Sequence, residues 1–238
     1  AFVLGIEIAI GNGVQLLVGR AFGSNNQADL AIAYWSGLFI NFSVALFFLF
    51  ILTFFDTELI GVITDNDELA KLVATYVSIT KYIVLLTAYT QVCTAFCNGR
   101  GKSKIPLKGF IIELPINALL SYLLINGFET YTGVGLEGAA WGSLVAVFLR
   151  ALFLFLALNA DDEVELTYPS NRSFKVEIRP QFAEIYPIAA NFFVLSVGAT
   201  VYQLLFAQLT LFSFVAITLI FPWLRAGTQF PNAVSYTH

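Results

Sequence analysis

The chain has 238 residues, of which 58% are hydrophobic and only 12% are charged, with a net charge of -4. Soluble globular domains carry roughly 25% charged residues, so water is not the main solvent of this chain. The acidic balance also argues against a nucleic-acid-binding surface, which needs clustered basic residues. These properties are typical of a multi-pass membrane protein whose partner is the lipid bilayer, with room for about seven spans of roughly 20 residues each.

Apolar stretches follow one another along the chain and predict transmembrane helices. They occupy residues 1–18, 30–55, 70–97, 107–127, 137–160, 184–206 and 211–238. Most are long enough to cross a hydrocarbon core of about 30 Å as helices. The predicted fold is therefore an all-α polytopic bundle. No charged residue lies between Glu184 and Arg225, and we place the turn between the last two helices near residues 208–210.

The loops between these stretches alternate in charge. Basic residues follow the first, third and fifth stretches, at Arg20, Arg100, Lys102, Lys104, Lys108, Arg172, Lys175 and Arg179. The intervening loops are mainly acidic. Because Lys and Arg are retained on the cytoplasmic side, the first helix should run from outside to inside.

A polar segment at residues 161–183 is the longest in the chain. It opens with acidic residues and then becomes basic before Pro180. We interpret it as a cytoplasmic linker between two bundles, one at residues 1–160 and the other at residues 184–238.

Cysteine and histidine chemistry is not expected. Cys93 and Cys97 lie one helical turn apart, a spacing typical of packing rather than of a disulfide framework. The one histidine, His238, is the last residue, so a histidine metal site or a catalytic triad is excluded. We therefore expect no enzyme activity, no metal ion and no cofactor. The chain also contains no Met and begins within an apolar stretch, which indicates a fragment.

Four segments resemble the multidrug and toxic compound extrusion (MATE) family. They are GVQLLVGRAFG at 13–23, NGRGKSKIP at 98–106, INALLSYLLING at 116–127 and GLEGAAWGSLVA at 135–146. In that family such segments belong to the second helix, the loop between helices four and five, and the fifth and sixth helices. Their order and spacing are collinear with the family over essentially the whole chain.

The resemblance implies two six-helix lobes around a central cavity. The chain would carry helices two to six at 1–160, the lobe linker at 161–183, and helices seven and eight at 184–238. The implied full-length protein is monomeric and lies in a cell membrane, with the bacterial inner membrane expected. Its implied activity is export of drugs, toxic compounds or organic cations in exchange for protons or sodium ions. A flippase of lipid-linked saccharides is the alternative function.

Ionisable side chains within the predicted spans are candidates for ion coupling or for lining a cavity. They are Glu7, Lys81, Glu113, Arg150 and, if the last helix continues to the chain end, Arg225. Measured along their helices, Glu7 and Lys81 lie at a similar depth, roughly 20–24 Å from the cytoplasmic side. We therefore expect these two side chains to be able to pair.

A polar stripe is predicted on the helix at 107–127. Glu113, Asn117 and Ser121 are spaced at i, i+4 and i+8, so they share one helix face. A carboxylate, an amide and a hydroxyl suit a hard cation or a proton relay. Two roles stay open for Glu113, which are a structural ion pair with Arg150 and direct coupling to a transported ion.

The resemblance bears on the coupling ion as well. It places Asn117 on a recurrent Asn of the family, and Ser121 where proton-coupled members typically carry Asp. Sodium-coupled members often carry Glu about two turns after a helix-opening Pro, but no carboxylate occurs at 192–196 after Pro187. Neither coupling pattern is complete, and Glu113 is the candidate replacement for the missing carboxylate.

Overall fold

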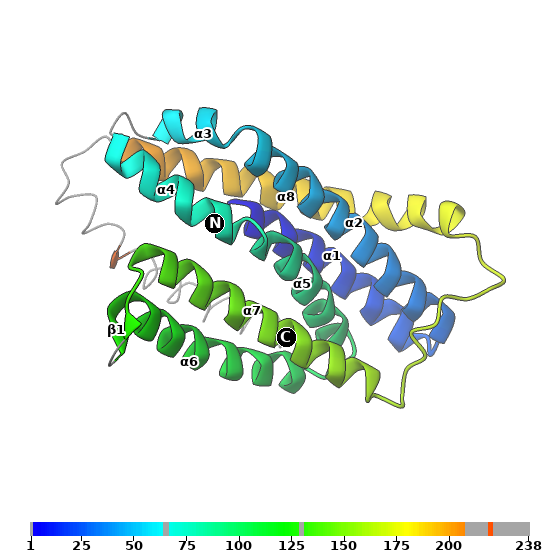
Figure 1. The fold of residues 1–238 in the computed structure, drawn as a ribbon. Helices are drawn as coiled ribbons and strands as arrows, with labels where there is room; N and C mark the ends of the chain where they lie inside the picture. The colour runs from blue at the N-terminus through cyan, green and yellow to red at the C-terminus, as the bar shows by residue number, and fades with distance from the viewer. Residues whose placement is uncertain (1, 64–66, 129–130, 208–218, 221–238) are drawn as a thin grey trace. The chain divides into compact units, whose positions relative to one another are not determined.

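The computed structural model describes residues 2–63, 67–128, 131–207 and 219–220 (Figure 1). The helices are α1 (Phe2–Gly23), α2 (Gln27–Phe54), α3 (Asp56–Ile63), α4 (Asp67–Thr80), α5 (Ile83–Gly99), α6 (Lys104–Asn126), α7 (Leu136–Asn159) and α8 (Phe174–Ala207). Two short strands, β1 (Gly127–Phe128) and β2 (Tyr131–Thr132), pair antiparallel between α6 and α7. The predicted all-α fold is confirmed.

Five of the predicted stretches correspond to helices of membrane-spanning length in the part of the chain that the structure describes. α1, α2, α6 and α7 are each long and apolar enough to cross a membrane, and α4 and α5 pass the same test as one span bent by 46°. The sixth predicted stretch falls within α8. The seventh, 211–238, lies outside the described residues except for Leu219 and Ile220.

α8 begins earlier than the sequence indicated. The polar linker was expected to extend to residue 183, but the helix already begins at Phe174. The backbone N–H groups of Val176 and Glu177 donate to the carbonyl of Ser173, which forms the first turn. Pro180 and Pro187 both lie inside α8.

The described residues fall into two compact units. One extends from Val3 to Phe193, and the other holds Phe2 together with residues 194–207 and 219–220. The contacts discussed below all belong to the first unit.

α6 and α7 are antiparallel neighbours whose spacing is set by glycine (Figure 1). A Cβ atom added to Gly142 would lie 2.7 Å from Ser121 Oγ, and one added to Gly138 would lie 2.5 Å from the carbonyl oxygen of Leu124. Small residues four positions apart allow membrane helices to approach closely. The α6–α7 interface therefore has no room for even one methyl group at these positions.

α1 and α5 run parallel and also meet at glycines. A Cβ atom at Gly11 would lie 3.5 Å from the carbonyl oxygen of Gln91, and one at Gly19 would lie 3.7 Å from that of Gly99. Both contacts join residues that are 80 apart in the sequence (91 − 11 and 99 − 19). This constant offset predicts which residues of α5 lie opposite any residue of α1.

Candidate functional site

Arg150 is buried among three helices, with 3% of its surface exposed. Its Nη1 donates to Glu113 Oε2 of α6 at 2.9 Å, and its Nη2 donates to Thr94 Oγ1 of α5 at 3.4 Å. The guanidinium carbon also lies 3.8 Å from the ring centroid of Phe110. An arginine at this depth needs a counter-ion because an uncompensated buried charge is costly. The ion pair considered as one role of Glu113 is present.

Asn117 lies next to this pair but belongs to a separate, neutral network. Its Oδ1 accepts hydrogen bonds from Ser121 Oγ at 3.0 Å and from Ser143 Oγ of α7 at 3.3 Å. The predicted stripe therefore divides in two. Glu113 neutralises Arg150, whereas Asn117 and Ser121 link α6 to α7 through uncharged groups.

Glu7 on α1 is fully buried, with 0% of its surface exposed. Among the described residues, neither of its carboxylate oxygens has a hydrogen-bond partner. The side chain of Thr87 on α5 faces it, as the offset of 80 between α1 and α5 requires. Glu7 is therefore a carboxyl group shielded from solvent with no base beside it.

Glu7 and Lys81 do not pair, contrary to the sequence-based prediction. Lys81 lies at the bend between α4 and α5, where its Nζ is 5.5 Å from the ring centroid of Tyr82. The prediction aligned Arg20 with Cys97 at the cytoplasmic side, but the structure places Gly19 opposite Gly99. Lys81 consequently precedes Thr87, the residue that faces Glu7, by six positions (87 − 81) and lies outside α5.

The remaining candidate, Arg225, lies outside the described residues. Among the residues that the structure describes, no group of three or more His, Cys, Asp or Glu side chains is placed to hold a metal ion. Cys93 and Cys97 are both buried and free.

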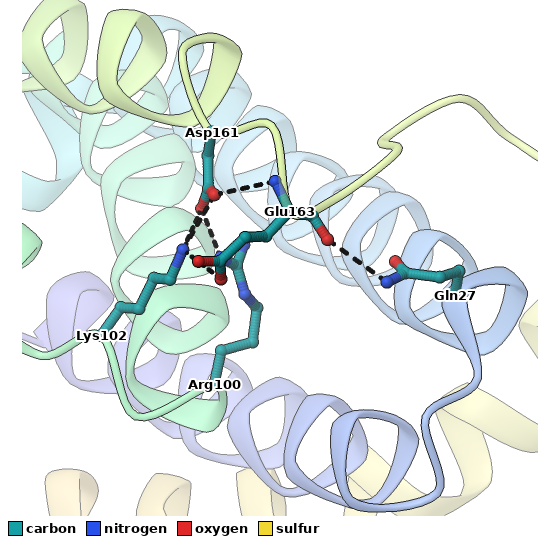
Figure 2. Close-up of polar contacts among 5 residues, drawn as sticks. All are labelled: Gln27, Arg100, Lys102, Asp161 and Glu163. Atoms are coloured by element: carbon teal, nitrogen blue, oxygen red, sulfur yellow. Dashed lines mark hydrogen bonds and ion pairs between the residues drawn. The ribbon is translucent and has the colours of Figure 1, made fainter.

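A charged cluster outside the spans joins the α5–α6 loop to the segment after α7 (Figure 2). Arg100 and Lys102 both pair with Asp161, and Lys102 Nζ also lies 2.7 Å from Glu163 Oε2. Gln27, the first residue of α2, donates to the backbone carbonyl of Glu163 at 3.3 Å. The cluster thus ties together three loops that the charge pattern placed on the cytoplasmic side.

The cluster also fixes the charge of Asp161, whose side chain is 8% exposed. Burial by itself would raise the pKa of this carboxyl, but the hydrogen bonds from Lys102 and Arg100 outweigh it and hold the pKa below its usual range. Hydrogen bonds to Asp161 and Glu163 raise the pKa of Lys102 in turn. Both groups are therefore charged at neutral pH.

Several polar residues at these sites were not predicted from the sequence. They are Thr94 and Ser143 beside the α6–α7 interface, Thr87 facing Glu7, and Asp161 in the charged cluster. Single Ser, Thr and Asn residues are frequent in membrane helices, so no local signal marks them. Asp161 was recognised only as part of an acidic run, because its partners are far away in the sequence.

Comparison with known proteins identifies the family. The model of the MatE family matches residues 1–123, which is more than half of the 238-residue chain. The chain belongs to the MATE family. Because the MATE family consists of transporters, membership also confirms that the chain is not an enzyme.

Curated relatives of this MATE chain include two bacterial proteins. The probable multidrug resistance protein YoeA of Bacillus subtilis is 24% identical over 157 residues, which covers 66% of this chain and 34% of that protein. The probable multidrug resistance protein NorM of Agrobacterium fabrum is 25% identical over 218 residues, which covers 91% and 44%. The chain therefore spans between a third and a half of the length of these relatives.

The fold of this chain likewise matches a little under half of a solved transporter structure. A multidrug resistance MATE family transporter of the MOP superfamily, in an inward-facing conformation, matches with a TM-score of 0.68 at 16% identity, covering 82% of this chain and 44% of that one. This MATE chain has the fold of about half of such a transporter.

Proposed function

We propose that the full-length protein is a secondary active antiporter that exports drugs, toxic compounds or organic cations in exchange for protons or sodium ions. Family membership and the names of the two bacterial relatives support this activity. Transport by rocking of two lobes around a site near the midplane fits the predicted division into helices two to six of one lobe and helices seven and eight of the other. The bacterial relatives also support a location in a bacterial inner membrane, where the protein acts as a monomer.

The observation that carries this proposal is the burial of ionisable side chains inside membrane-spanning helices. Glu7 and Arg150 both lie within spans and are almost entirely shielded. A charged side chain at the centre of a span costs about 2.5–3.5 kcal/mol on insertion scales, and such residues mark ion or substrate pathways. Arg150 has a counter-ion in Glu113, so Glu7, which has none among the described residues, is the group that supports an ion pathway.

Of the two roles left open for Glu113, the ion pair favours the structural one. A proton bound to Glu113 would leave Arg150 buried without its counter-ion, at a cost of several kcal/mol. Asn117 and Ser121 are engaged with each other and with Ser143. We therefore assign Glu113 to holding α6 against α7, and the coupling ion to another group.

The alternative function, a flippase of lipid-linked saccharides, has less support. A cavity for anionic headgroups should present several bases whose charge is not already neutralised. Within the described spans, the deeply buried base Arg150 is paired with Glu113. The antiporter accounts better for this arrangement.

Dye efflux from cells that express the full-length gene tests the proposal. A cationic dye should leave the cells only while a cation gradient persists, and separate collapse of the proton and sodium gradients identifies the coupling ion. Efflux that survives the loss of both gradients, or an absence of efflux with the protein present in the membrane, would refute the antiporter.

A further inference from the structure

The surroundings of Glu7 offer little to stabilise a negative charge. The side chain is fully covered by the residues of this chain. Among the described residues, neither carboxylate oxygen has a hydrogen-bond partner. An ionised carboxylate that is neither solvated nor paired costs several kcal/mol, and such a group binds a proton instead.

The polar groups near Glu7 have acceptors left over rather than donors. The Thr87 hydroxyl donates its one hydrogen to the backbone, with the carbonyl oxygens of Ile83 and Val84 both at 3.0 Å. In that arrangement Thr87 Oγ1 presents its lone pairs to Glu7, and it can donate to a carboxylate only if its hydrogen leaves the backbone carbonyls. A neutral carboxylic acid offers its own O–H to this oxygen without that change.

Asn41 on α2 shows the same excess of acceptors one residue further along α5. It is fully buried, and its Nδ2 donates to the carbonyl of Ala88 at 3.0 Å. Its Oδ1 has no partner among the described residues. Asn41 Oδ1 is thus a second buried acceptor without a donor next to this part of α5.

The helices packed against α1 bring no base to Glu7. These are α2, α5 and the first part of α8, which contact α1 at Gly37, Gln91 and Ile185. Of the charged groups on these helices, Glu184 pairs with Arg20 and Asp29 lies 4.0 Å from Arg172. Lys175 and Arg179 precede Glu184 in α8, on the side of the Arg20 end of α1. The titratable neutral groups, Tyr34, Tyr89 and Cys93, interact with one another.

We propose that Glu7 is a proton-binding site, occupied by a proton in this conformation. The carboxylate takes the proton from water to form an O–H bond, and the same bond breaks when water reaches the group again. Access requires separation of α1 from α5, which are in backbone contact at Gly11 and Gly19 and pack the Val18 side chain against Gly99.

The transport role of this site rests on the proposed antiporter. In that account, Glu7 carries the exchanged proton and replaces the carboxylates that the family pattern lacks at Ser121 and after Pro187. The protonation of Glu7 itself is independent of transport and is measurable without it.

Infrared spectroscopy of the purified full-length protein at neutral pH tests the proposal. A protonated carboxyl has a carbonyl stretching band that is resolved from the bands of ionised carboxylates. The spectrum of wild type minus that of Glu7→Gln should show this band, and Glu7→Asp should shift it. Glu58→Gln, which removes an exposed carboxylate, is the matched control and should leave the band unchanged.

The proposal is overturned if the band is equally strong in wild type and Glu7→Gln, both folded by size-exclusion chromatography. Should Glu7→Gln fail to fold, an unshifted band in Glu7→Asp overturns it. A protein that shows the band but exports no dye would contradict only the antiporter. Proton-driven export without the band would contradict only the site.

Discussion

Two carboxyl groups within the membrane-spanning helices, Glu113 and Glu7, differ in what lies beside them. Glu113 is bound by Arg150 across the antiparallel α6–α7 interface. Glu7 lies in the parallel α1–α5 interface, faces the Thr87 hydroxyl, and has no hydrogen-bonded partner for its carboxylate oxygens among the described residues. The same residue type therefore acts in one place as a fixed counter-ion and in the other as a group that holds a proton.

The presence or absence of a neighbouring counter-ion, rather than depth in the membrane, decides the role of a buried carboxyl group. Burial penalises the charged form at both positions. At Glu113, the attraction of Arg150 offsets that penalty and the charge persists. At Glu7 no counter-ion offsets the penalty, so the carboxyl group becomes neutral by binding a proton.

Removal of Arg150 should have the largest effect, because it makes Glu113 resemble Glu7. Arg150→Leu is expected to destabilise the full-length protein by about 3–5 kcal/mol, the usual cost of breaking a buried ion pair from one side. Thermal unfolding in detergent measures the loss. The double variant Arg150→Leu/Glu113→Leu should recover most of it, and equal stability of the single variant and wild type would show that the pair holds nothing together.

The charged cluster outside the spans offers a second ion pair, and here the expected effect depends on pH. Because the pKa of Asp161 is lowered in the folded protein, its contribution is present above its usual pKa of about 4 and is lost as pH falls through the folded value. Asp161→Asn should cost about 1.5–3 kcal/mol at neutral pH.

Melting temperatures recorded across a pH series check this expectation. Wild type should lose stability relative to Asp161→Asn only at acidic pH, so the two curves should converge there. Curves that stay parallel down to acidic pH would show that the ionised Asp161 side chain does not stabilise the folded state.

The two interfaces themselves should respond differently to one added methyl group. Gly142→Ala places a Cβ atom 2.7 Å from Ser121 Oγ, whereas the same change at Gly11 gives an ordinary contact of 3.5 Å with Gln91. We expect a loss of about 1–3 kcal/mol for Gly142→Ala from overpacking, and a much smaller loss for Gly11→Ala. Melting temperatures of the two variants measure the difference, and equal losses would contradict the difference in packing.

The smallest effect on stability is expected at Glu7. Glutamine has the shape of a neutral glutamic acid, so Glu7→Gln should change the free energy of unfolding by less than about 1 kcal/mol. The matched variant Glu113→Gln should lose more, because it removes the counter-ion of Arg150. Thermal unfolding of both variants gives the comparison, and a larger loss at Glu7 would indicate that Glu7 is ionised.

The sequence predicted the spans well, and it also predicted the surroundings of Glu113 better than those of Glu7. The apolar stretches located α1, α2, α6 and α7, and the i+4 spacing placed Asn117 and Ser121 on one face. Pairing of Glu113 with Arg150 was foreseen as one of two roles, because both are ionisable residues within successive predicted spans.

The sequence could not predict the environment of Glu7 for a physical reason. α1 and α5 are separated by a whole span and their relative shift is set by packing at Gly11 and Gly19, which no charge pattern reports. An error of a few residues in that shift was enough to bring Lys81 beside Glu7 in the prediction. The bend between α4 and α5 and the meeting of Arg100 with Asp161 also depend on tertiary contacts.

Efflux by the full-length protein in proteoliposomes, driven by an imposed proton gradient, tests the contrast between Glu7 and Glu113 most directly. We predict that Glu7→Gln abolishes the dependence of dye transport on the gradient. Glu113→Gln should retain that dependence per folded molecule despite its lower stability. Proton-driven transport that persists in Glu7→Gln but is lost in folded Glu113→Gln would contradict the account and return the coupling role to Glu113.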